Sequence, residues 1–133
     1  MATHRLALVG GLELSSQFRE WVCEQARADG FDNEAIVEIA LAVSEAVSNI
    51  VRHAYQGRSD GRIKATLTVN DTALTLHLRD YGLKFDPDTY QEPDLDNATV
   101  GGYGVFLIHT VMDEVRYETD HDEGTALIMV KRR

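Results

Sequence analysis

Apolar residues recur at helical spacing from residue 36 to residue 54, and this long stripe limits most strongly how the chain can fold. At about 100° per residue its members fall within about 60° of one direction, so one face of a long helix must be covered by a core. Asp32 or Asn33 can cap the start of this helix, and we expect it to end near Tyr55. The stripe consists of Ile36, Ile39, Ala40, Val43, Val47, Ile50, Val51 and Ala54.

The apolar period then changes from helical to alternating, which predicts a hairpin with one wet face over residues 62–78. We also expect a strand over residues 4–9, an amphipathic helix over 12–28, a short apolar helix over 105–112, and strands over 114–119 and 125–131. These elements predict an α+β fold, a two-layer sandwich of a mostly antiparallel sheet with helices on one face.

Length and charge restrict the function further. At 133 residues the chain is expected to be a single domain spanning residues 1–133. The net charge of −9 argues against sequence-independent nucleic-acid binding and favours a basic protein partner. A lone cysteine, Cys23, is typical of a reducing compartment. With no apolar stretch of about 18 residues and no leader pattern, we expect a cytoplasmic protein with no membrane contact.

Three groups of residues could carry chemistry, and the first lies on the long helix. Glu45, Asn49 and His53 are spaced four apart and therefore share one helix face. A carboxylate that can accept a proton, beside an amide oxygen that can bind Mg²⁺, is what a nucleotide-dependent transfer needs. The same pattern is also expected of an ordinary solvated helix face.

The other two groups lie further along the chain. Asp80-Tyr81-Gly82 follows a predicted strand, where a carboxylate could accept a hydrogen bond from an exocyclic amine, although Asp-x-Gly is also a common turn. Gly101, Gly102 and Gly104 precede a helix and could admit phosphate, or act as a hinge. This segment is neither a Walker loop nor a dinucleotide fingerprint.

These groups occur in one order, and that order resembles a known family. The stretches EIALAVSEAVSNIVRHAYQG, LHLRDYGLKFDP, GGYGVFLIHTVMDEVRYE and GTALIMVKR resemble the N, G1 and G2 boxes and the terminal Gly-Thr of the Bergerat-type ATP-binding fold. Within this histidine-kinase-like ATPase superfamily, they look most like the anti-sigma-factor serine-protein kinases of the RsbW and SpoIIAB type. The resemblance runs from about Glu34 to the C-terminal residues.

The resemblance implies roles for individual residues, with ATP and Mg²⁺ as cofactors. It implies that Glu45 is the catalytic base on the attacking serine hydroxyl and that Asn49 ligates Mg²⁺. It places His53 beside the phosphates or in a structural role. It also implies that Asp80 binds the adenine amino group, with Gly82 beside the ring and Thr125 supporting adenine through its hydroxyl. Gly102 and Gly104 would line the phosphates.

One departure concerns the segment that would cover the phosphates, roughly residues 88–100. No Lys or Arg lies between Lys84 and Arg116, so charge compensation would fall on Mg²⁺, backbone N–H groups, and Arg52 or Lys84. This favours slow turnover, or ATP as a purely structural ligand.

The function implied is partner switching in transcription regulation and stress response. The chain would phosphorylate a Ser or Thr of a STAS-type anti-anti-sigma protein, and would sequester a sigma factor when that antagonist is phosphorylated. A homodimer formed through the first helix and opening strand is also implied. Two alternatives stay open: a non-catalytic, ATP-binding module that sequesters proteins, and a switch kinase acting on a signalling complex without a sigma factor.

Overall fold

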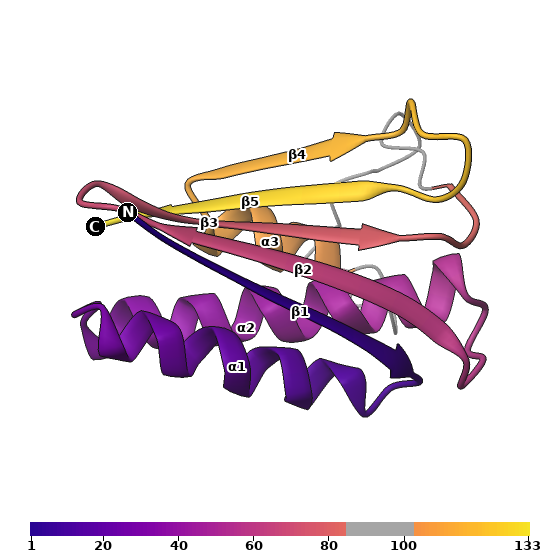
Figure 1. The fold of residues 1–133 in the computed structure, drawn as a ribbon, viewed down its shortest axis with the longest axis horizontal. Coiled ribbons are helices and arrows are strands. Elements are labelled where there is room, and N and C mark those ends of the chain that lie inside the picture. Colours follow the sequence, from indigo (N-terminus) through magenta and orange to yellow (C-terminus); the bar gives the residue numbers. More distant parts are fainter. Residues whose placement is uncertain (85–102) are drawn as a thin grey trace, which may run out of the picture.

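The chain folds into one antiparallel sheet with its helices packed on one face (Figure 1), as the sequence predicts. The structure is a computed structural model that describes residues 1–84 and 103–133. The strand order is β1-β2-β3-β5-β4, and every neighbouring pair is antiparallel. The strands are β1 (Ala2–Gly10), β2 (Gly61–Val69), β3 (Ala73–Asp80), β4 (Glu114–Glu118) and β5 (Ala126–Arg132). The helices are α1 (Leu14–Ala28), α2 (Asn33–Asn49), η1 (Ile50–Ala54) and α3 (Tyr103–Val111).

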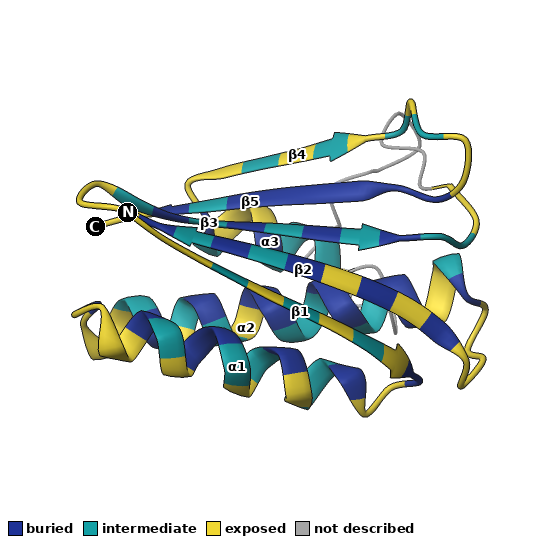
Figure 2. Cartoon of the chain, in the orientation of Figure 1, coloured by how far each residue is buried: buried dark blue, intermediate teal, exposed yellow. Residues whose placement is uncertain are grey.

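The core lies between the sheet and the helices. Alternate residues of β2 and β3 are buried, and Figure 2 shows the resulting stripes along both strands. Phe18 and Val22 of α1 and Ile39 of α2 cover these residues and are fully buried. None of the helices in residues 1–84 and 103–133 is long and apolar enough to cross a membrane.

The long helix differs in two ways from the one that the periodicity predicts. Ala42 and Ala46 are buried, whereas Ala40 and Ala54 are only partly buried, because α2 is contacted by α1 on one side and by α3 on another. The α-helical part also ends at Asn49, and a π-helical turn, η1, continues to Ala54. Positive φ angles of 55° at Gln56 and 78° at Gly57 then end the helix.

The start of α2 follows the sequence prediction. Asp32 is the N-cap, and its Oδ1 accepts a hydrogen bond of 2.8 Å from the N–H of Ala35. Glu34 adds a negative charge to the first turn, which favours the positive end of the helix dipole. The first helix has no such cap: the side chain of Glu13 accepts a hydrogen bond from the N–H of Gly11 instead.

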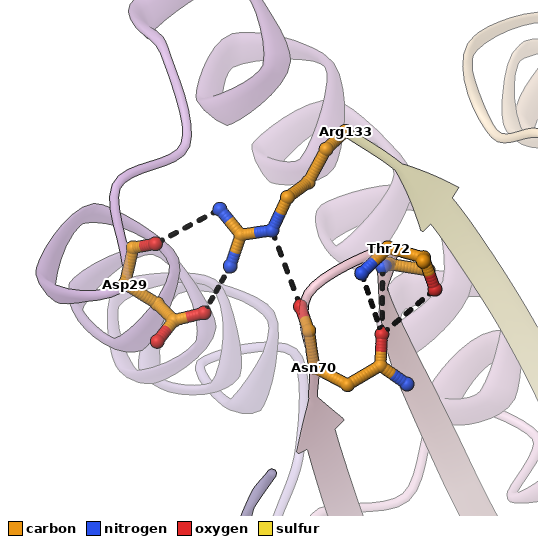
Figure 3. Close-up of polar contacts among 5 residues, drawn as sticks. Asp29, Asn70, Thr72 and Arg133 are labelled. Atoms are coloured by element: carbon orange, nitrogen blue, oxygen red, sulfur yellow. Dashed lines mark hydrogen bonds and ion pairs between the residues drawn. The ribbon is translucent and has the colours of Figure 1, made fainter.

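Arg133 contacts the end of α1 and the β2–β3 turn, at the end of the sheet where β3 begins (Figure 3). Its guanidinium donates to the carbonyl oxygens of Asp29 and Asn70 and pairs with the Asp29 carboxylate. It also lies 4.4 Å from the centre of the Phe31 ring. In the β2–β3 turn, the side-chain oxygen of Asn70 accepts from the N–H and hydroxyl of Thr72. Arg133 therefore connects the residue that follows α1, Asp29, to the β2–β3 hairpin.

We predict that Arg133→Ala lowers the free energy of unfolding by about 1 kcal/mol, because it removes a partly exposed ion pair together with a cation–π contact. Urea denaturation measures the change. Arg132→Ala is the matched control, since its pair with Glu114 is more than half exposed on both sides and should contribute less than about 0.5 kcal/mol. Equal losses in the two variants would contradict this role for Arg133.

Candidate functional site

A cavity of about 440 Å³ opens where α2, η1, α3 and the end of β3 meet. It brings together five of the residues singled out from the sequence: Asn49, His53, Asp80, Gly104 and Thr125. Lys84 is a further polar lining residue. The rest of the lining is formed by Ala46, Ile50, Ala54, Leu83, Val105, Ile108, Tyr117 and Leu127. The cavity therefore combines nonpolar walls with a small number of polar groups, which is typical of a small-molecule site.

The other predicted residues lie around this cavity. Glu45 is half-buried on α2, one turn before Asn49. Arg52 is exposed on η1 and is not among the residues that line the cavity. Gly82 lines an adjoining, more open hollow. Gly102 and the segment 88–100 lie outside the described residues.

Asp80 is a buried carboxylate at the end of β3, with only 4% of its surface exposed. Its Oδ1 accepts a hydrogen bond of 3.1 Å from the N–H of Gly82, and its own N–H donates to the carbonyl of Thr125. Burial raises the pKa of Asp80, while hydrogen bonds from the backbone of Gly82 and Thr125 and the charge of Arg79 oppose that rise. The protein thus holds a carboxylate whose desolvation these contacts offset only in part.

Gly82 lies directly against the end of η1. The N–H of Leu83 donates a hydrogen bond of 2.8 Å to the carbonyl oxygen of Ala54, and a Cβ added at Gly82 would lie 2.2 Å from that same oxygen. Gly124 makes a similar approach from the other side, with φ at 70° and a Cβ position 2.2 Å from the carbonyl oxygen of Asp80. The main chain around Asp80 is therefore packed too closely for any side chain at these two positions.

Tyr55 joins the end of η1 to β2 and to the segment that follows β3. The sequence pattern did not predict this role, because it marks Tyr55 only as the end of a helix. The Tyr55 hydroxyl accepts a hydrogen bond of 2.8 Å from the N–H of Tyr81 and donates one of 2.5 Å to the carbonyl of Arg62. Burial raises the pKa of this hydroxyl, which stays protonated and able to donate at neutral pH. The N–H of Tyr55 closes η1 by donating to Ile50.

Glu45 and Asn49 converge on Gly104 at the start of α3. A Cβ at Gly104 would lie 2.9 Å from Glu45 Oε2 and 3.0 Å from Asn49 Nδ2, so glycine lets the ends of both side chains approach the start of α3 without being displaced. The other end of α3 is fixed by Lys131, which was missed in the sequence because it occupies an alternating strand. Its Nζ donates to the carbonyl of Val111 at 2.7 Å and pairs with Glu38 at 3.3 Å.

This arrangement fits a nucleotide with a magnesium ion. A purine amine could donate to Asp80. Gly104 lines the cavity near the N-terminal end of α3, where backbone N–H groups without helical partners would favour a phosphate. Residues 1–84 and 103–133 contain no cluster of three His, Cys, Asp or Glu side chains that could hold a metal. One amide ligand from Asn49 still fits Mg²⁺, which keeps several waters and takes most other ligands from phosphates.

Comparison with known proteins identifies the fold family. Residues 11–131 match the sequence pattern of the histidine kinase-like ATPase domain. The chain belongs to the histidine kinase-like ATPase family. The α+β architecture and the family resemblance predicted from the sequence are both confirmed.

Curated relatives narrow the resemblance within this family. The chain is 36% identical over 110 residues to the serine-protein kinase RsbW of Listeria monocytogenes, covering 77% of this chain and 69% of the relative. It is 33% identical over 110 residues to the RsbW of Bacillus licheniformis, covering 77% and 68%. It is 33% identical over 106 residues to the anti-sigma F factor of Clostridium novyi, covering 74% and 72%.

We predict that Gly82→Ala costs about 2 kcal/mol of stability or more and weakens ATP binding, because the new methyl group forces Ala54 away from the loop that follows Asp80. Thermal denaturation and ATP titration measure the two effects. The control is Gly57→Ala, whose Cβ meets nothing within 4 Å but whose φ of 78° should cost about 1 kcal/mol. ATP binding should survive in the control, and unchanged ATP binding in Gly82→Ala would contradict the close packing.

A second prediction concerns pH. Because burial raises the pKa of Asp80, its contribution to stability is fully present below the unfolded pKa of about 4 and is lost as pH rises through the folded pKa. Asp80→Asn keeps an acceptor for the Gly82 N–H and removes the charge. We therefore expect the variant to gain stability relative to the wild type as the pH rises above about 4, as measured by denaturation across a pH series. If the stability of the wild type instead rose relative to that of the variant with pH, the pocket would stabilise the ionised carboxylate.

Proposed function

We propose that the chain binds Mg²⁺-ATP in this cavity and is a serine-protein kinase that phosphorylates a serine or threonine of a STAS-type anti-anti-sigma protein. The observation that carries the proposal is the convergence of Glu45 and Asn49 on Gly104, next to a cavity that contains buried Asp80. The names of the relatives, serine-protein kinase and anti-sigma factor, support the same class of activity.

The adenine end of the site would be formed by Asp80 and its surroundings. The Asp80 carboxylate accepts a hydrogen bond from the exocyclic amine of adenine, and the hydroxyl of Thr125 supports the ring. Nonpolar side chains of Ile50 and Leu127 offer surface to a planar base, and burial of that base is favourable. The main chain at Gly82, which lines the adjoining hollow, would flank the ring.

The phosphate end would lie beside α3. Asn49 ligates Mg²⁺, and Gly102 and Gly104 leave main-chain N–H groups accessible to the phosphate oxygens. His53 and exposed Lys84 line the cavity, and exposed Arg52 lies next to His53 in the chain. Lys84 and Arg52 would add positive charge near the phosphates. When bound, Mg²⁺ supplies compensation for the negative charge of the transferring phosphate.

Glu45 would act as the base. Its carboxylate takes the proton of the attacking serine hydroxyl as the serine oxygen bonds to the γ-phosphorus, and ADP departs with the bridging oxygen. The side chain is only half-buried, which leaves room for a hydroxyl group from another protein to approach. Phosphorylation of that partner would free this chain to sequester a sigma factor, and a homodimer would present two such sites.

A second candidate function is an ATP-dependent sequestering module without catalysis. The absence of Lys and Arg between Lys84 and Arg116 favours it, because phosphoryl transfer depends on positive charge around the transferring group. In that case ATP would stabilise a binding surface, and the partner would be held and released without modification.

The test is incubation of the chain with γ-labelled ATP, Mg²⁺ and the STAS-domain protein encoded nearest to it. We predict label on the partner, with transfer reduced by about 100-fold or more in Glu45→Gln and with ATP affinity retained. Glu34→Gln is the matched control, since Glu34 is an exposed carboxylate on the same helix and should not affect transfer.

Three results separate the candidates. Loss of label in Glu45→Gln alone supports the kinase and its base. Unchanged transfer in this variant shows that another group takes the proton. No transfer by the wild type, with ATP binding and partner binding both measured, supports the sequestering module.

A further inference from the structure

The outer face of the sheet carries a cluster of positive side chains around one aromatic ring. The guanidinium carbons of Arg62 and Arg79 each lie 4.4 Å from the centre of the Tyr81 ring, and the Nζ of Lys64 lies 5.8 Å from it. We call these four residues the outer cluster. Arg62 and Lys64 are exposed, and Arg79 and Tyr81 are partly exposed. The cluster therefore lies at the surface, on the face of the sheet away from the helices.

The strand register places these side chains together. Lys64 is directly opposite Arg79 in the β2–β3 ladder, so two like charges face each other across neighbouring strands. Such a pair is destabilising, and the surrounding cations increase the repulsion. On the other side, Val9 and Ala7 of β1 pair with Arg62 and Lys64.

Within residues 1–84 and 103–133, no ion pair includes a cation of this cluster. Among the described residues, the guanidinium of Arg79 donates to the neighbouring main-chain carbonyl of Asp80. This is unusual in a chain with 22 acidic and 13 basic residues, where carboxylates are plentiful. The protein thus concentrates positive charge at one place while its overall charge is −9.

We infer that the outer cluster is a docking surface for an acidic segment of a partner protein. Charge complementarity requires an anionic occupant, and the neighbouring nonpolar surface indicates a protein: Val9 is 64% exposed and lies opposite Arg62. Arg and Tyr are the residue types that contribute most at the centres of protein interfaces. A nucleic acid carries continuous negative charge that would extend beyond the cluster over the acidic remainder of the chain, whereas a short acidic segment can lie within the cluster.

This inference goes beyond the proposed function and does not depend on it. The docking surface shares a strand end with the cavity, because Arg79 and Tyr81 project outward while Asp80 between them is buried. The main chain of both Arg62 and Tyr81 is bonded to the Tyr55 hydroxyl. An occupant of the outer cluster would therefore contact the elements that hold the floor of the cavity without entering it.

The experiment is a titration of the ¹⁵N-labelled chain with a synthetic peptide of about a dozen residues in which acidic residues alternate with leucine. We expect amide shifts at residues 62–64 and 79–81, and binding that weakens as salt is added. Arg62→Glu should weaken binding about tenfold or more. Arg27→Glu, which makes the same charge change at an exposed position of α1, should leave it unaltered.

The folding of Arg62→Glu is checked by its melting temperature, which should equal or exceed that of the wild type because like-charge repulsion is relieved. Equal loss of binding in Arg62→Glu and Arg27→Glu, or shifts confined to the cavity, would overturn the proposal. Tighter binding of single-stranded oligothymidine at these residues would also overturn it. So would a change in the oligomeric state of the free chain in Arg62→Glu, which would make this face a contact between copies.

Discussion

The contact between the end of η1 and the segment after β3 is the constraint on which the site depends. Gly82 lies so close to the carbonyl of Ala54 that no Cβ fits, and Leu83 donates a hydrogen bond to the same carbonyl. The hydroxyl of Tyr55 adds bonds to the main chain of Tyr81 and Arg62. Helix and sheet are thus held together by main-chain contacts and by the Tyr55 side chain, and Asp80 is kept buried at the point where they meet. The unfavourable burial of this carboxylate is sustained by the surrounding structure.

The end of β3 serves both faces of the sheet because strand side chains alternate. Asp80 points into the cavity, whereas Arg79 and Tyr81 point to the outer face. Among the residues that the structure describes, exposed Lys84 is the one Lys or Arg that lines the cavity, while three cations gather on the outer face. Under the proposed function, such a site would rely on Mg²⁺ and main-chain N–H groups for the phosphates, and the basic side chains of the outer cluster would serve to recognise a partner.

The sequence predicts the elements well, since the two hydrophobic periods of α2 and of the β2–β3 hairpin are strong local signals. It also singles out Asn49, Asp80, Gly104 and Thr125, because their order resembles a known family. The structure places these four residues in the lining of one cavity, and their roles there are those of the proposed function. The π-helical turn was not predictable, since it depends on tertiary contacts and not on periodicity. The roles of Tyr55 and Lys131 were likewise missed, because the partners of both are distant in sequence.

In the proposed function, the buried Asp80 carboxylate accepts a hydrogen bond from the amino group of adenine. The most direct test compares the affinity of the chain for ATP and for inosine triphosphate, which carries an oxygen in place of that amino group, by calorimetry with Mg²⁺ present. A hydrogen bond to a charged, buried acceptor predicts that ATP binds about tenfold to 100-fold more tightly. Equal affinity for the two nucleotides would contradict the claim and would place the base elsewhere in the cavity.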